Sequence, residues 1–130
     1  MTTTGNYLGA TAHELRANTR ADKAAGAISQ KALFRRRGTI ELGPDTLTLT
    51  AWSETGELRL HRNDITSIDR TYTDLYGRFL GGLLDSGKPL ILDTLPGGEI
   101  YLLIDRREIM ESTRNKQWEN AIRRWLDTRN

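Results

Sequence analysis

The clearest hydrophobic pattern in the chain lies close to its C-terminal end, over residues 113–128. Large apolar side chains recur there every three or four residues, at Trp118, Ile122, Trp125 and Leu126. This spacing places them on one stripe of an α-helix, while charged residues occupy the other faces. A helix that is so polar on its back needs an apolar surface to cover. We therefore predict a C-terminal amphipathic helix packed on the rest of the chain, with Ser112 or Thr113 as its N-cap.

Ahead of this helix, polar and apolar residues alternate, which is typical of strands with one buried face. Such runs cover residues 36–42, 46–52 and 57–61. Turn sequences separate them, at residues 43–45 after the first run and residues 53–56 after the second. We predict three antiparallel strands joined by hairpin turns, forming a sheet with one buried face.

The run at residues 46–52 alternates without interruption. Its pattern assigns Leu47, Leu49 and Ala51 to the buried face. Trp52 falls on the opposite, solvent-facing side together with the threonines, because β-branched threonine is common on the wet face of a strand.

A second group of strands is expected further along. Ile65 and Ile68 are three residues apart, which does not suit a plain strand. We therefore predict a single turn that buries Ile65, followed by a strand over residues 67–73. Residues 88–95 and 99–105 predict a hairpin around a Pro-Gly-Gly turn.

The apolar residues of this second hairpin supply the candidate core. Its expected members are Leu90, Leu92, Ile100, Leu102 and Ile104. Tyr101 and Leu103 point the other way, and we expect the C-terminal helix to bury them.

The N-terminal part of the chain has a weaker pattern. Residues 1–9 suggest a frayed start, and residues 10–25 are rich in alanine and favour a helix. Ile28, Leu33 and Phe34 are expected to anchor this part to the body. We accordingly divide the chain into a basic, partly helical N-terminal arm over residues 1–35 and a main domain over residues 36–130.

Residues 75–84 combine large apolar side chains with three glycines, which argue against a long regular helix. If this stretch is an exposed loop, it would contact a partner or a lipid, through Leu75, Tyr76, Phe79 and Leu80. If it is buried, its apolar side chains would fill the interior of the sheet.

Composition bounds the class of protein. The chain has 130 residues, no cysteine and no apolar stretch long enough to span a bilayer. The first residues lack the pattern of a signal peptide, so we expect a cytoplasmic protein. Charge is uneven: residues 1–37 hold seven Lys and Arg against two acids, a net charge of +5, and the remainder holds twelve against fifteen, a net charge of −3. Such asymmetry can indicate an anionic partner. The simpler interpretation, which we prefer, is that these charges lie against the body of the protein or in water.

Taken together, these elements predict a mostly β fold with α: a bent antiparallel sheet, or half-open barrel, capped by a C-terminal helix. The order of elements, the Asp64-Ile65-Thr66-Ser67-Ile68 segment and the Trp-bearing final helix resemble the pleckstrin-homology-like fold. The similarity covers about residues 36–128 and is greatest to bacterial PH-like and GRAM-like domains. The resemblance implies a binding module rather than an enzyme. In that family phosphoinositide binding uses basic residues around the first hairpin, and residues 42–46 contain none.

The residues themselves show no catalytic constellation. His13 and His61 have neither the histidine partner nor the carboxylate spacing of a zinc site. No phosphate-binding glycine loop or nucleophile elbow is present in the sequence. We expect no cofactor and no metal.

Function is therefore expected to reside in binding. The first hypothesis is a non-enzymatic interaction module that docks a protein partner or self-associates, using the sheet edge or the apolar 75–84 stretch. Arg35, Arg36 and Arg37 are candidate contacts to an acidic partner or to lipid phosphates. A second is peripheral binding to anionic membranes through the basic arm. A third is a barrel that binds a small apolar ligand in its mouth or acts as an enzyme. Nucleic acid is disfavoured, because the aromatic residues lie on expected core faces.

Overall fold

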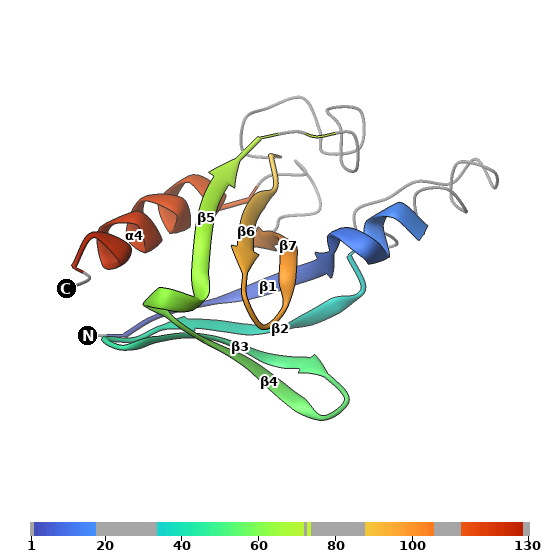
Figure 1. Cartoon of the computed structure of the whole chain (residues 1–130), viewed down its shortest axis with the longest axis horizontal. Helices are drawn as coiled ribbons and strands as arrows, with labels where there is room; N and C mark the ends of the chain where they lie inside the picture. The colour runs from blue at the N-terminus through green and yellow to red at the C-terminus, as the bar shows by residue number, and fades with distance from the viewer. Residues whose placement is uncertain (1, 18–33, 72, 74–87, 106–112, 129–130) are drawn as a thin grey trace.

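The computed structural model describes residues 2–17, 34–71, 73, 88–105 and 113–128. Within them, one seven-stranded antiparallel sheet curls into a half-barrel, and a C-terminal helix packs beside it (Figure 1). The strands are β1 (Thr3–Thr11), β2 (Arg36–Leu42), β3 (Thr46–Ser53), β4 (Gly56–His61), β5 (Ile65–Arg70), β6 (Leu90–Thr94) and β7 (Gly98–Ile104). A 3-10 turn, η1 (Arg62–Asp64), precedes β5, and the C-terminal helix is α4 (Asn115–Asp127). The predicted mostly β fold with a half-open barrel and C-terminal helix is confirmed at this level.

Strand β1 lies in the middle of the sheet, whose order is β4-β3-β2-β1-β7-β6-β5. It pairs with β2 along one side, where Tyr7 lies opposite Gly38, and with β7 along the other, where Tyr7 lies opposite Ile104. The expected frayed start is therefore wrong. The N-terminal arm predicted for residues 1–35 is likewise wrong for residues 3–11, because they are a central strand.

The strand missed by the sequence pattern owes its position to small residues. A Cβ atom on Gly5 would lie 3.1 Å from the Trp118 ring, and one on Gly9 would lie 2.7 Å from the Trp52 ring. The two glycines therefore make room for tryptophans on the inner face of the sheet. They also remove the bulky alternating side chains by which a strand is usually detected.

The predicted helix near the N-terminus is present in part. Described helical residues run from 12 to 17, directly after β1. A reciprocal capping box begins this helix: the Thr11 hydroxyl accepts a hydrogen bond from the Glu14 N–H at 3.1 Å, and the Glu14 carboxylate accepts one from the Thr11 N–H at 2.9 Å. Residues 18–33, including Ile28 and Leu33, lie outside the described part of the chain.

The main core fills the concave side of the sheet and lies beneath α4. The five candidate core residues of β6 and β7 are all fully buried in it, as predicted. The apolar stripe of α4 enters the same cluster through Trp118, Ile122 and Trp125. The sequence prediction for the face of the C-terminal helix is therefore confirmed.

A second apolar cluster lies apart from the main core. Tyr101 and Leu103 belong to this cluster, together with Leu15 of the N-terminal helical residues and Phe34. Both are buried as expected, but α4 does not bury them, so that part of the prediction is wrong. The reason is strand alternation, which points neighbouring residues of β7 to opposite faces of the sheet.

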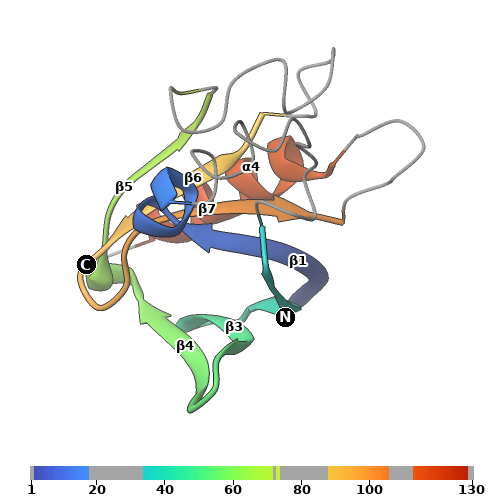
Figure 2. The same cartoon turned by 90° about the vertical axis from the view of Figure 1, so that its right-hand side faces the viewer.

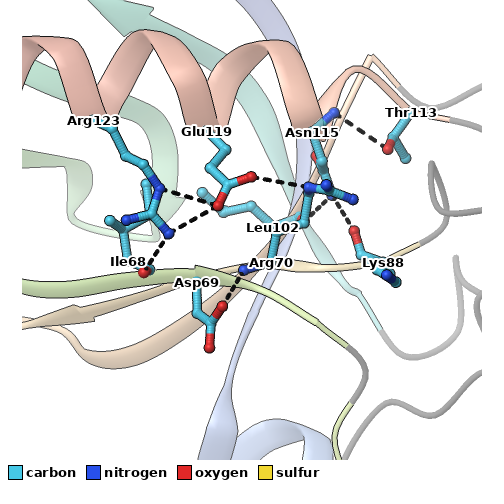
Figure 3. A network of polar contacts seen from close by, with 9 residues as sticks. All are labelled: Ile68, Asp69, Arg70, Lys88, Leu102, Thr113, Asn115, Glu119 and Arg123. Carbon is cyan, nitrogen blue, oxygen red and sulfur yellow. Dashed lines mark hydrogen bonds and ion pairs between the residues drawn. The ribbon is translucent and has the colours of Figure 1, made fainter.

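The start of α4 is fixed by a buried side-chain amide. Asn115 has no exposed surface, and its Oδ1 accepts a hydrogen bond from the Ile104 N–H at 2.8 Å. Its Nδ2 donates to the carbonyls of Lys88 at 2.7 Å and Leu102 at 3.0 Å (Figure 3). The N-cap residue is Arg114, so the prediction of Ser112 or Thr113 at this position is wrong. The Thr113 hydroxyl accepts a hydrogen bond from the Asn115 N–H at 3.3 Å.

Charged groups hold the middle of α4 against β5. The Glu119 carboxylate accepts hydrogen bonds from Arg70 at 3.0 Å and from Arg123 at 2.9 Å, and Arg123 also donates to the Ile68 carbonyl (Figure 3). Burial acts to raise the pKa of Glu119, but hydrogen bonds and positive charge from Arg123 and Arg70 outweigh it. The pKa of Glu119 is therefore lowered from its ordinary value.

The end of α4 is attached to the other half of the sheet. The Arg62 guanidinium lies 4.7 Å from the centre of the Trp125 ring and donates to the carbonyls of Trp125 and Pro44. Trp125 Nε1 donates to the same Pro44 carbonyl at 3.1 Å. Helix α4 thus connects the β2–β3 turn with β5.

We predict that Trp125→Ala lowers the free energy of unfolding by about 3–5 kcal/mol, because it leaves a cavity under α4 and removes the contact with Pro44. Chemical denaturation measures this change. Arg124→Ala, at the exposed neighbouring position, is the control and should shift stability by no more than about 0.5 kcal/mol. A loss below about 1 kcal/mol for Trp125→Ala would contradict its place in the core.

We predict that Glu119→Gln destabilises the protein by about 1–2 kcal/mol at pH 7, and that this difference shrinks on acidification. A carboxylate whose pKa is lowered by folding stabilises the native state above its ordinary pKa, and this stabilisation disappears as pH falls through the lowered value. Urea denaturation of both proteins between pH 7 and pH 3 tests this. A difference that stays constant with pH would show that the carboxylate charge is not responsible.

Candidate functional site

A surface hollow of about 650 Å³ opens where β2 begins, beside the β3–β4 hairpin. It contains the basic cluster that the sequence singled out, and we call it the arginine hollow. Its lining residues are Arg35, Arg36, Arg37, Ala51, Trp52, Ser53, Glu54 and Thr55.

A β-bulge in β3 shapes this hollow. The pairing of β3 with β4 changes register between Leu49 and Ser53, and Ala51 has a φ of 53°. The bulge exposes Ala51 and turns Trp52 into the main core. The sequence assignment of these two residues is therefore wrong, because a bulge reverses the alternation beyond it.

Two other strands, β1 and β2, hold the bulge in place. The Tyr7 hydroxyl donates to the Thr50 carbonyl at 2.6 Å. The Thr50 hydroxyl accepts from the Thr39 N–H at 2.8 Å and donates to the Thr39 carbonyl at 3.2 Å, so a side chain takes the place of a backbone partner. A Cβ atom on Gly38 would lie only 2.3 Å from the Thr50 carbonyl oxygen, so only glycine fits without displacing the bulge.

Arg36 is the innermost arginine of the hollow. Its guanidinium lies 4.7 Å from the centre of the Trp52 ring and also donates to the Trp52 carbonyl. Its Nε donates to the Glu14 carboxylate at 2.9 Å, which connects the N-terminal helical residues to the hollow. Arg36 is therefore engaged within the protein and forms part of the floor of the site.

The pKa values of two side chains beneath the hollow, Tyr7 and Glu14, are shifted by their surroundings. Burial raises the pKa of Tyr7 to about 12, although the charge of Arg36 opposes the shift. Burial also acts to raise the pKa of Glu14, but hydrogen bonds from Arg36 and Thr11 outweigh it and leave that pKa below its ordinary value. The floor thus carries a stable Arg36–Glu14 ion pair above acidic pH.

Arg35 and Arg37 differ from Arg36 because both are exposed. Arg37 lies in β2, and Arg35 directly precedes that strand. Across the hollow, the hydroxyls of Ser53 and Thr55 lie 2.8 Å from each other. The hollow therefore places arginine side chains and two mutually bonded hydroxyls on one surface, and guanidinium groups are able to bind anionic groups.

The other sequence-predicted contacts cannot be placed with these arginines. Leu75, Tyr76, Phe79 and Leu80 lie outside the described residues. His13 and His61 are both exposed, and the described part of the chain contains no group of three His, Asp or Glu that could hold a metal ion. None of the helices described is long and apolar enough to cross a membrane.

Sequence reasoning missed the residues that build the floor of the hollow, Tyr7, Glu14 and Trp52. One available signal was the Thr11-Ala12-His13-Glu14 pattern, which is a capping box and marks a helix start at Ala12. A helix that starts at Ala12 leaves the residues before it available for a strand, and this prediction would also have placed Glu14 close to the sheet. No local signal indicated the inward turn of Trp52.

The described residues thus form a curled antiparallel sheet with a C-terminal helix and a surface hollow lined by arginines. No protein-family model matches the chain, and no curated protein has a significant sequence match to it.

We predict that Gly38→Ala lowers the free energy of unfolding by about 1–3 kcal/mol, because the added methyl group collides with the backbone of the bulge. Gly43→Ala is the matched control: the nearest atom to its added Cβ lies 3.8 Å away, an ordinary contact. Denaturation curves of the two variants should differ clearly. Equal stability would contradict the close approach of β2 and β3 at Thr50.

Proposed function

We propose that the chain is a non-enzymatic binding module of the pleckstrin-homology-like type, which docks a protein partner through an acidic segment bound in the arginine hollow. Support for the fold type comes from seven antiparallel strands that curl into a half-barrel, followed by a helix carrying buried tryptophans. The docking function is supported chiefly by three consecutive arginines that line one hollow, with Arg36 fixed in its floor.

The geometry of the hollow suits carboxylate side chains. A guanidinium presents paired N–H donors that match the two oxygens of a carboxylate. Arg35 and Arg37 flank Arg36 in the chain and line the same hollow. The ion pair of Arg36 with Glu14 and its contact with Trp52 fix the start of β2 between them. A site of this kind needs little rearrangement on binding, which lowers the entropic cost of association.

A protein segment is favoured over an anionic membrane surface by the acidic residue within the hollow. Glu54 lines the same hollow as the arginines, and it would oppose a continuous negative surface. Near such a surface each basic group contributes about 1 kcal/mol, so two exposed arginines would give weak attachment. A peptide can place its acidic groups by the arginines and keep them away from Glu54.

A small apolar ligand in the barrel mouth has less support. Trp118 and Trp125 are buried in the main core beneath α4, where they occupy the space such a ligand would need.

We predict that Arg35→Glu/Arg37→Glu weakens binding of a fluorescein-labelled hexaglutamate peptide at least about tenfold, because both attractive groups become repulsive. Fluorescence anisotropy at low salt measures the association constant. Arg36 is left intact, since its loss would disturb the floor of the hollow.

The matched control is Lys116→Glu/Arg124→Glu, which makes the same change in net charge at two exposed positions of α4. It should change peptide binding less than about threefold if the hollow is the site. Vesicles with about 30% phosphatidylserine form the second arm and should bind weakly. Peptide binding that Arg35→Glu/Arg37→Glu leaves unchanged would overturn the proposal. Binding to vesicles without binding to the peptide would also overturn it and would identify a membrane as the partner.

A further inference from the structure

The two edges of the sheet differ in how they are covered. Helix α4 packs against β5, where Arg123 of the helix donates to the Ile68 carbonyl and Glu119 accepts from Arg70. Strand β4 forms the opposite edge and pairs only with β3 among the described strands. In Figures 1 and 2 the β3–β4 hairpin projects away from α4. An edge of this kind presents unpaired backbone N–H and C=O groups to any strand that can approach it.

The side chains of β4 have a pattern that bears on which strand fits. Leu58 and Leu60 point inwards, where Leu60 is fully buried and Leu58 is half-buried against the main core. Glu57 and Arg59 point outwards and form an ion pair of 2.6 Å, with side-chain exposures of 39% and 62%. The pairing with β3 is regular from Leu58 to His61, so this part of the edge has no bulge to turn a partner away.

We propose that β4 pairs antiparallel with β4 of a second copy of this chain, with Leu58 opposite Leu58 on the two-fold axis. In this register Glu57 of each copy lies directly opposite Arg59 of the other. Opposite charges facing each other across strands are stabilising, and here each arginine lies between its own glutamate and that of the other copy. The half-buried Leu58 side chains meet on the inner face and complete each other's burial.

Neighbouring registers are disfavoured by the same side chains. A shift by two residues in one direction places Arg59 opposite Arg59, and a shift by two in the other places Glu57 opposite Glu57. A shift by one residue would place leucines opposite charged residues and break the continuity of the buried face. The charges therefore select one self-complementary arrangement, as expected for an interface with two-fold symmetry.

The size of the contact sets how tight this dimer is. Strand β4 has six residues, so pairing through it alone buries less than a standard protein interface. The dimer is therefore expected to form reversibly as concentration rises. This inference is independent of the arginine hollow, and its test uses different variants.

Sedimentation velocity over a concentration series up to about 1 mM measures the association, which is the range suited to a small, weak interface. The wild-type chain should dimerise, and Glu57→Arg or Arg59→Glu alone should weaken the association at least about tenfold, because like charges then face each other. An equimolar mixture of these two variants should recover it, and so should the double swap within one chain. Asp127→Arg, an exposed charge reversal on α4, is the control and should behave as wild type.

A second measurement identifies the register without altering the charges. The chain has no cysteine, so Leu58→Cys introduces a single thiol next to the proposed axis. Directly opposed Cβ atoms in an antiparallel pair lie close enough for a disulfide. Mild oxidation should cross-link Leu58→Cys into a dimer and leave Asp69→Cys, on the β5 edge, largely monomeric. A wild-type monomer throughout the series, charge variants that associate as wild type, or equal cross-linking at both edges would each overturn the proposal.

Discussion

The fold depends on one set of backbone hydrogen bonds, those that β1 makes on both of its sides. Strands β2, β3 and β4 form one meander and β5, β6 and β7 form another, and in the order of the sheet only β1 lies between them. Its pairing with β2 and β7 therefore turns two small sheets into a single curled one. A meander of three strands has little buried surface of its own, so each half gains its core by joining the other.

The sequence predicted secondary structure well wherever one face of an element is exposed to solvent. Alternation located most strands, and the helical stripe located the buried face of α4, because in both cases solvent marks the outer side. It failed at β1, where apolar residues lie on both faces and glycines replace the expected large side chains. Gly5 and Gly9 are explained by Trp118 and Trp52, which belong to distant parts of the chain, so no local pattern could reveal their role.

The candidate site, like the fold, could be predicted from the sequence only in part. The arginines of β2 were evident from their charge, but their different roles depend on contacts that only the fold creates. Arg36 is directed inwards by Glu14 and Trp52, and the position of Trp52 depends on the bulge at Thr50. Because that bulge is held by hydrogen bonds from β1 and β2, its position follows from tertiary structure and not from local propensity.

The buried amide of Asn115 restricts which side chains can replace it at the start of α4. Its single acceptor meets one backbone N–H and its two donated hydrogens meet two carbonyls. An aspartate could accept but would set a negative charge against both carbonyls, and a leucine would remove all three hydrogen bonds. Position 115 therefore requires an amide of this length, because only such a side chain supplies one acceptor and two donors to these three groups at once.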